Sequence, residues 1–316
     1  MNFVDSGNTR GRFGALALAA LALAGTTQAG EVPRFASGTN LVVLSATAVD
    51  RHGRPVTNLR PTEFRVLEDG RPQRLEHFSE AQTLPARLLV LVDASGSMTG
   101  GVKTTSVKMA VTQLLAGMQA EDQVALAGFD HQYWGLVPFT TDRERILRAI
   151  GEIQPFGSTA LHDALDHAAR DLSTWSEGRR AVVVVTDGVD TASQLRPDEV
   201  LARSQALDVP IYAVSVVSPV DDPASDFFTG RERPAVATAG TVVLEKYARL
   251  SGGASFTVSD LGGLQRAAAT ILGELKHQYR LGYDPPRGPS QFRRVEVQST
   301  RKGVLVKTRS GYVPRT

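Results

Sequence analysis

Oxygen-bearing side chains follow an apolar run in the first third of this 316-residue chain. Residues 88–98 read Leu-Leu-Val-Leu-Val-Asp-Ala-Ser-Gly-Ser-Met, so the run ends at Asp93, Ser95 and Ser97. A short run without polar alternation is typical of a strand buried on both faces, and open α/β sheets bind ligands past the carboxyl ends of such strands. Alternate residues of an extended loop point the same way, which would gather one carboxylate and two hydroxyls. These are hard oxygen ligands for Mg²⁺, Ca²⁺ or Mn²⁺, and a serine-rich turn after a core strand is the alternative interpretation.

Two later stretches carry comparable residues. Residues 155–165 place Thr159 at the start of an expected helix, and residues 180–190 form another apolar run that ends at Asp187. The motifs Asp-x-Ser-x-Ser, Gly-x-Thr-Ala-Leu and Thr-Asp-Gly resemble, in this order, the three metal-binding loops of the von Willebrand factor type A domain. The resemblance covers residues 85–276. It implies a metal-ion-dependent adhesion site formed by Asp93, Ser95, Ser97, Thr159 and Asp187.

The resemblance also implies what the cation does. Proteins of this family bind protein ligands through the metal ion. Mainly neutral hydroxyl ligands leave the ion much of its charge, and an open coordination position then attracts a carboxylate from outside. We therefore expect a partner protein that offers an acidic side chain. Mg²⁺ is the expected ion because the site is small and rich in hydroxyls, and Mn²⁺ or Ca²⁺ would also be accepted.

From Ala86 to Lys276, apolar strand-like runs alternate with helical periods. This alternation predicts an α/β fold, a Rossmann-like, doubly wound and mainly parallel sheet with helices on both faces. Besides the first run, the expected strands are 123–129, 133–139 as an antiparallel edge, 182–185, 211–217 and 254–258. The expected helices include 143–153, 160–172, 197–207, 241–250 and 261–275, after an amphipathic stripe at 107–118. Residues 218–240 interrupt the pattern and predict a long surface loop.

The two flanks of this region are rich in β-prone residues. Residues 38–82 contain an Asp-Gly turn between strand-like runs, the strongest short-range sign of a hairpin, and residues 278–313 alternate polar and apolar side chains. Each flank is too short to bury a good core alone. We expect N- and C-terminal β segments that pair into one small β-sandwich, with the α/β domain inserted between them. Similar flanks accompany this domain in a group of bacterial secreted proteins that the chain resembles.

The amino terminus resembles an export signal. Arg10 and Arg12 precede an apolar stretch at 13–24, and Thr27-Gln-Ala29 ends in a small residue. This pattern predicts a Sec-type signal peptide over residues 1–29 with cleavage before Gly30. The apolar stretch is too short to span a bilayer comfortably, so no stable membrane span is expected after cleavage. The protein is expected to be exported, either periplasmic or secreted.

Composition and missing motifs exclude several functions. The formal net charge is +2 with both signs interspersed, which argues against a nucleic-acid partner, and the chain has no cysteine and therefore no disulfide or thiol chemistry. No Gly-x-Ser-x-Gly elbow and no phosphate-binding Gly-Lys-Ser/Thr loop occurs, and His162 is the single histidine near the site that could act as a base. We expect a secreted or envelope protein-binding module and not an enzyme. The alternatives are a metal-assisted hydrolase and a scaffold whose ion only staples the loops.

Overall fold

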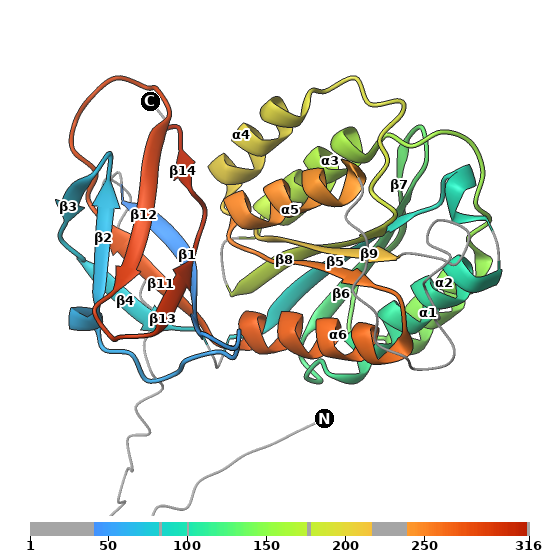
Figure 1. The fold of residues 1–316 in the computed structure, drawn as a ribbon, viewed down its shortest axis with the longest axis horizontal. Coiled ribbons are helices and arrows are strands. Elements are labelled where there is room, and N and C mark those ends of the chain that lie inside the picture. The colour runs from blue at the N-terminus through green and yellow to red at the C-terminus, as the bar shows by residue number, and fades with distance from the viewer. Residues whose placement is uncertain (1–40, 82–83, 100, 176–177, 217–238, 315–316) are drawn as a thin grey trace, which may run out of the picture. The chain divides into compact units, whose positions relative to one another are not determined.

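The centre of the fold is a six-stranded sheet in a computed structural model (Figure 1) that describes residues 41–81, 84–99, 101–175, 178–216 and 239–314. The strand order is β10-β9-β8-β5-β6-β7, and all neighbours are parallel except β6 and β7. The strands are β5 (Ala86–Asp93), β6 (Gln123–Phe129), β7 (Tyr133–Thr140), β8 (Arg179–Thr186), β9 (Ile211–Val216) and β10 (Ser255–Val258). The central strands β5, β8 and β9 are almost wholly buried, as the continuous apolar runs predict.

Helices cover both faces of this sheet, as Figure 1 shows. One layer contains α1 (Gly101–Ala116), α2 (Arg143–Glu152) and α6 (Leu261–Lys276), and the other contains α3 (Leu161–Ser173), α4 (Pro197–Leu207) and α5 (Ala239–Ser251). Side chains of each strand alternate between the two layers. Val90 and Val92 pack on the first layer, whereas Leu89 and Leu91 pack on the second. The two separate apolar clusters explain why every residue of β5 after Arg87 is buried.

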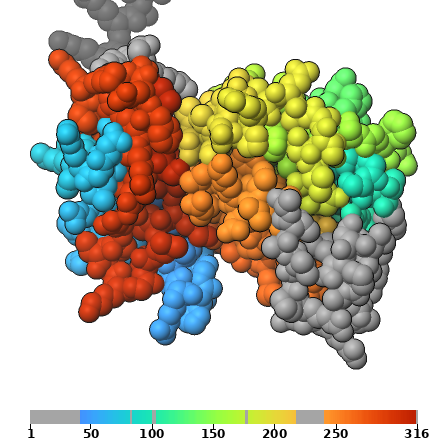
Figure 2. All heavy atoms as spheres, turned by 45° about the horizontal axis from the view of Figure 1, so that its top comes forward, coloured from blue at the N-terminus to red at the C-terminus, as the bar shows by residue number. Residues whose placement is uncertain are grey.

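Two small antiparallel sheets form a second core from both ends of the chain. Their orders are β13-β1-β11-β4 and β14-β12-β2-β3. The N-terminal strands are β1 (Val42–Asp50), β2 (Phe64–Glu68), β3 (Arg71–Gln73) and β4 (His77–Glu80), with the 3-10 turn η1 (Pro61–Glu63). The C-terminal strands are β11 (Gln278–Tyr283), β12 (Arg293–Ser299), β13 (Val304–Lys307) and β14 (Gly311–Tyr312). Figure 2 shows the early (blue and cyan) and late (red) residues packed side by side.

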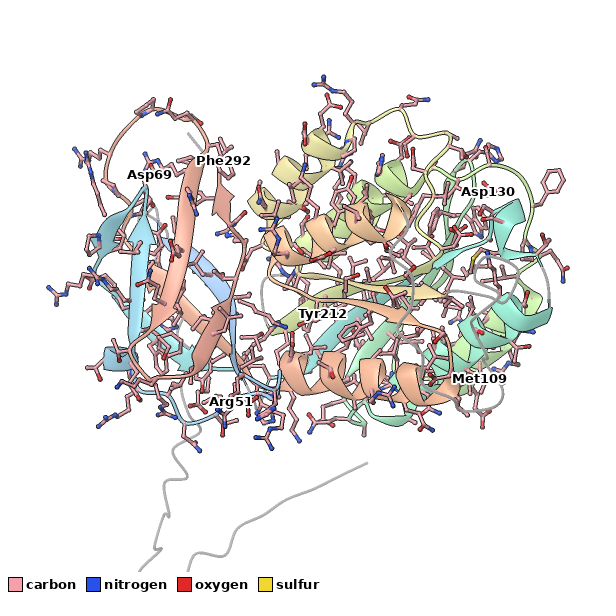
Figure 3. The ribbon with its side chains drawn as sticks, in the orientation of Figure 1. Arg51, Asp69, Met109, Asp130, Tyr212 and Phe292 are labelled. Atoms are coloured by element: carbon pink, nitrogen blue, oxygen red, sulfur yellow. The ribbon has the colours of Figure 1, made fainter. Side chains whose placement is uncertain are left out.

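The apolar faces of these sheets meet in one core. It includes Leu44, Val66, Leu281 and Val297, which come from both terminal segments. The predicted Asp-Gly turn joins β2 to β3, with φ of 48° at Asp69 (labelled in Figure 3) and 76° at Gly70. Two consecutive positive φ values are those of a tight hairpin turn, which Asp-Gly adopts readily.

The predicted fold class is confirmed: a mixed, mainly parallel α/β core with β segments from both termini that pair with each other. After the hairpin the chain leaves this sheet, because β4 pairs with β11 in the other sheet. The signal peptide at 1–29 and nearly all of the loop at 218–240 lie outside the described residues. No helix within the described ranges combines the length and apolar character needed to cross a membrane.

Candidate metal centre

The first loop of the predicted site begins where β5 ends. The Asp93 side chain is buried, with 1% of the residue exposed, and its Oδ1 accepts a hydrogen bond from the Ser95 amide at 2.9 Å. Its Oδ2 accepts a hydrogen bond from the Thr186 hydroxyl at the end of β8. The hydroxyl oxygens of Ser95 and Ser97 lie 3.0 Å apart. The oxygens of these three residues therefore lie close together. They do so around the 3-10 turn η2 (Gly96–Met98), and the extended loop expected from the alternate spacing was wrong.

The protonation of Asp93 reflects its position. Burial raises the pKa of this carboxyl from its ordinary value of 3.8 to about 6, and the negative charge of Asp187 contributes to the rise. Hydrogen bonds from Ser95 and Thr186 oppose this rise because they favour the ionised form. Without a cation beside it, Asp93 is thus a carboxylate that is costly to keep charged.

The second loop is tied to the first by main-chain hydrogen bonds. The Gly96 amide donates to the Gly157 carbonyl at 2.8 Å, and the Phe156 amide donates to the Ala94 carbonyl at 2.7 Å. These bonds fix the chain that leads to Thr159, which precedes α3 and is 4% exposed. Thr159 also donates its amide to the Thr191 hydroxyl at 2.9 Å, which attaches it to the chain after β8.

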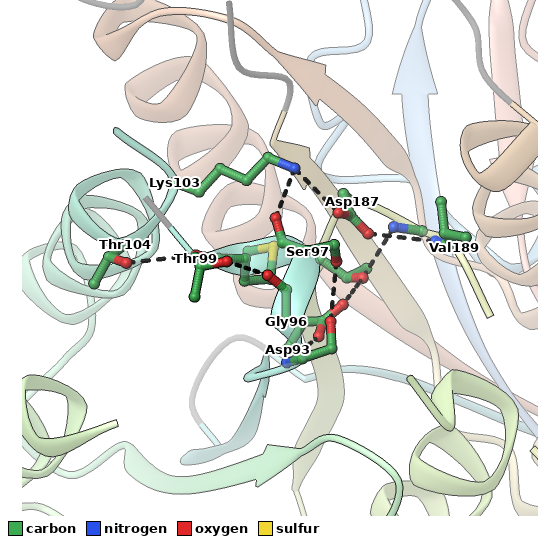
Figure 4. Close-up of polar contacts among 12 residues, drawn as sticks. Asp93, Gly96, Ser97, Thr99, Lys103, Thr104, Asp187 and Val189 are labelled. Atoms are coloured by element: carbon green, nitrogen blue, oxygen red, sulfur yellow. Dashed lines mark hydrogen bonds and ion pairs between the residues drawn. The ribbon is translucent and has the colours of Figure 1, made fainter. Parts of the chain in front are cut away.

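The third loop follows β8 and contains Asp187. A lysine reaches this residue: the Lys103 ammonium lies 3.1 Å from Asp187 Oδ2 and 3.0 Å from the main-chain carbonyl oxygen of Ser97 (Figure 4). Lys103 belongs to the first turn of α1 and is 5% exposed. Sequence reasoning missed it. The helix dipole disfavours a cation at a helix N-terminus, and the first turn of α1 contains no acidic residue. A lysine in that turn was therefore the one available sign of a carboxylate from elsewhere in the chain.

The donor set fits a hard cation. Two carboxylates and three hydroxyls provide only oxygen atoms, which favours Mg²⁺, Mn²⁺ or Ca²⁺ over metals that prefer nitrogen or sulfur. Among the described residues, no group of three or more His, Cys, Asp or Glu side chains is placed to hold a metal ion. The candidate metal centre is therefore the set of two carboxylates and three hydroxyls on the three predicted loops. Main-chain hydrogen bonds join the first two loops, and Lys103 links Asp187 of the third loop to Ser97 of the first.

The surroundings of His162 do not resemble those of a catalytic base. Its Nδ1 lies 2.9 Å from the hydroxyl oxygen of Tyr247, and its Nε2 lies 3.7 Å from Asp190 Oδ2. The nearby Ser193 hydroxyl donates to Asp190 at 2.6 Å, so it faces a carboxylate and not the imidazole. Burial lowers the pKa of His162, against the raising effect of Asp190 and Asp163. These groups support the start of α3, and Asp163 accepts hydrogen bonds from the amides of residues 194 and 195.

Comparison with known proteins concerns the domain that carries these loops. Residues 88–189 match the family model of the von Willebrand factor type A domain. A solved structure described as von Willebrand factor type A from Catenulispora acidiphila superposes with a TM-score of 0.51 at 12% identity, covering 88% of this chain and 75% of that one. At this identity the likeness concerns the fold alone.

Two curated relatives match part of the chain. An uncharacterized protein of Borreliella burgdorferi is 28% identical over 141 residues, which are 42% of this chain and 41% of that protein. The minor fimbrium subunit Mfa5 of Porphyromonas gingivalis is 27% identical over 153 residues, which are 46% of this chain and 12% of that subunit. The chain thus spans less than half the length of either relative.

Proposed function

Because the chain carries a von Willebrand factor type A domain, we propose that it captures a partner protein through a divalent cation held by the three loops after β5, before α3 and after β8. The observation that supports the proposal is that hydrogen bonds join the three loops, which carry five oxygen-bearing side chains, at the carboxyl edge of the parallel strands. In open α/β sheets this edge is where ligands bind. The ligands of the ion would be Asp93, Ser95, Ser97, Thr159 and Asp187.

The proposed ligands include neutral hydroxyls and charged carboxylates, and the two kinds have different roles. When bound, the ion supplies a coordination position that a carboxylate of the partner can fill. The hydroxyls of Ser95, Ser97 and Thr159 add no negative charge, so they leave the cation attractive to an acidic group. Asp93 and Asp187 anchor the ion, either directly or through bound water. Mg²⁺ is the proposed ion, and Mn²⁺ or Ca²⁺ fit the same oxygen donors.

Two exposed apolar side chains stand on the same loops as the ligands. Phe156, on the second loop, is 79% exposed, and Val189, on the third loop, is 48% exposed. The main-chain bond from Phe156 to Ala94 fixes the backbone of this aromatic residue without covering its ring. Aromatic residues are frequent anchors of protein interfaces, and a preordered backbone reduces the entropy lost on binding. These features support a protein partner over a small-molecule substrate.

The proposed setting is outside the cytoplasm. The segment 1–29 has the pattern of a signal peptide, and one relative is described as a minor fimbrium subunit. We therefore place the mature protein in the periplasm or among secreted proteins. No catalytic role is proposed, because both ring nitrogens of His162 face other partners, the Tyr247 hydroxyl and the Asp190 carboxylate.

Calorimetry of the purified protein with Mg²⁺, Mn²⁺ and Ca²⁺ tests the metal site. Thr159→Ala removes one neutral ligand and should weaken binding about tenfold or more while the main-chain hydrogen bonds of residue 159 keep the loops in place. Thr270→Ala, on the outer face of α6, is the matched control and should bind the ion as the wild type does. Failure of every divalent ion to bind at millimolar concentration would refute the proposed site.

Capture of partners from envelope extract separates the functional alternatives. Captured proteins should be released by EDTA and recovered when Mg²⁺ is restored, in the wild type and not in the Thr159→Ala variant. If the ion binds but capture is indifferent to EDTA, the ion only staples the loops. Turnover of generic ester or phosphate substrates, dependent on the same ion, would instead indicate a metal-assisted hydrolase.

A further inference from the structure

Lys103 lies inside the candidate metal centre, and two acceptors of its ammonium belong to site residues. Its ammonium donates to Asp187 Oδ2 at 3.1 Å and to the Ser97 carbonyl oxygen at 3.0 Å (Figure 4). The side chain of Lys103 is 6% exposed and that of Asp187 is 12% exposed. This ion pair is therefore largely buried, and solvent and salt screen the attraction between its two charges only weakly.

The position of Lys103 in its helix indicates that the pair is specific. The residue lies in the first turn of α1, where the helix dipole disfavours a positive charge. A buried ammonium also loses its hydration, and this loss must be compensated by acceptors nearby. Asp187 and the Ser97 carbonyl supply such acceptors from two different loops. The lysine thus joins the first and third loops of the site.

A lysine ammonium and a divalent ion would compete for the same carboxylate. Asp187 is one of two acidic residues in the donor set, and a metal ion gains most of its attraction from such charges. Two cations that approach the same carboxylate at close range repel each other strongly in a poorly hydrated site. This repulsion favours different arrangements of Lys103 in the metal-free and metal-loaded protein.

We propose that Lys103 is a tethered cation that holds Asp187 in the metal-free protein and must leave it when a divalent ion binds. The inference rests on the proposed function, because it assumes that the same loops bind a metal ion. It follows that Lys103 lowers the affinity for the ion and keeps the first and third loops joined in its absence. Metal binding is then an exchange of one cation for another, coupled to a movement at the start of α1.

The test compares Mg²⁺ binding by calorimetry, at one pH, among the wild type and three variants. Lys103→Met keeps the length of the side chain but not its charge and should bind Mg²⁺ at least about tenfold more tightly than the wild type, a difference of about 1.4 kcal/mol. Lys103→Arg keeps the charge and should stay near the wild-type affinity. Lys108→Met, on the same helix, controls for loss of a positive charge elsewhere and should change little.

A second measurement follows the lysine directly in the wild type and uses Lys103→Arg only to assign its resonance. With the lysine side chains labelled with ¹³C at Cε, one resonance of the wild type should shift as Mg²⁺ is added, and this resonance should be missing in Lys103→Arg. Equal affinity of Lys103→Met and the wild type, or a Lys103 resonance that is unchanged at saturating Mg²⁺, would overturn the role of Lys103 and leave the metal site intact. If neither the wild type nor Lys103→Met binds a divalent ion, both this inference and the proposed function are wrong.

Discussion

Gly188 and Gly240 pack backbone against backbone, where the loop that carries Asp187 meets the first turn of α5. A β-carbon added to Gly240 would lie 2.5 Å from the carbonyl carbon of Gly188, and one added to Gly188 would lie 2.8 Å from the carbonyl carbon of Gly240. Gly188 also has a φ of +87°, which residues with side chains rarely adopt. The glycine of the Thr-Asp-Gly motif therefore sets the path of the third loop as well as permitting its turn.

Gly188→Ala should destabilise the protein by about 2 kcal/mol or more, since the new methyl group meets backbone atoms that cannot move aside cheaply and the residue is held at positive φ. Denaturant unfolding in EDTA measures the change. Gly151→Ala is the matched control, because no atom lies within 4 Å of its added β-carbon and the residue lies in α2, so it should leave stability equal or slightly higher. Equal effects of the two substitutions would show that the third loop tolerates another path.

Asp93→Asn should stabilise the metal-free protein at neutral pH. The folded-state pKa of Asp93 is raised to about 6, above its ordinary 3.8, so the folded chain holds the proton more tightly than the unfolded chain does. The stabilising contribution of the protonated carboxyl is complete below about pH 4 and is lost as the pH rises through 6. The wild type should therefore match the variant near pH 4 and become less stable by up to about 3 kcal/mol near pH 8.

Thermal unfolding in EDTA between pH 4 and pH 8 measures this difference. Asp284→Asn, a substitution at an exposed aspartate, is the control and should follow the wild type at each pH. A stability difference between Asp93→Asn and the wild type that does not vary with pH would mean that Asp93 titrates as an ordinary carboxyl.

Phe156→Ala should reduce capture of the partner without changing the affinity for Mg²⁺. The ring is 79% exposed on the loop that carries Thr159, so its loss removes apolar contact area and leaves the metal ligands in place. Phe292, labelled in Figure 3, is 49% exposed in the β-sandwich, and Phe292→Ala is the control. Calorimetry with Mg²⁺ and quantitative capture from extract, made on both variants, separate the two effects. Unchanged capture by Phe156→Ala would place the interface elsewhere.

The strands that carry the site could be predicted from the sequence because their signal is local. β5 and β8 are continuous apolar runs that end in polar motifs, and each pattern lies within about a dozen residues. The position of Thr159 before α3 follows from a similarly local pattern. Burial on both faces of a parallel sheet leaves few alternatives for such runs, and the order of the motifs then places their loops at one edge.

Features that depend on distant partners could not be predicted in this way. Lys103 meets Asp187 across 84 positions of the chain, and no periodicity or turn signal links them. β4 pairs with β11 and not with β2 or β3. This choice depends on which sheet offers a free edge, and the sequence near β4 gives no information about that edge. The turn at Asp69 could be predicted because its signal lies within four residues. The other neighbour of β2 in the sheet, β12, comes from the far end of the chain and could not be predicted in this way.

Glu68 links the two terminal β segments through buried hydrogen bonds. It is 2% exposed at the end of β2, and its carboxylate accepts hydrogen bonds from Arg293 of β12 at 2.8 Å, Tyr283 of β11 at 2.6 Å and Tyr312 of β14 at 2.8 Å. Three strands from the C-terminal segment thus converge on one carboxylate from the N-terminal segment. Burial and the neighbouring carboxylate raise the pKa of Tyr312 to about 12, so its hydroxyl remains a donor at all ordinary pH values.

Glu68→Gln should lower the free energy of unfolding by about 3 kcal/mol, because it leaves the buried Arg293 charge unpaired and replaces one accepting carboxylate oxygen by an amide nitrogen that can only donate. Glu296→Gln, on the exposed side of β12, is the control and should change stability little. Denaturant unfolding gives the free energy, and amide hydrogen exchange gives its location. Exchange should quicken in β2 and in β11 and β12 together, since their shared core cannot open on one side alone. Faster exchange confined to β2 would show that the C-terminal strands hold their structure without the N-terminal segment, and that the two flanks are not one sandwich.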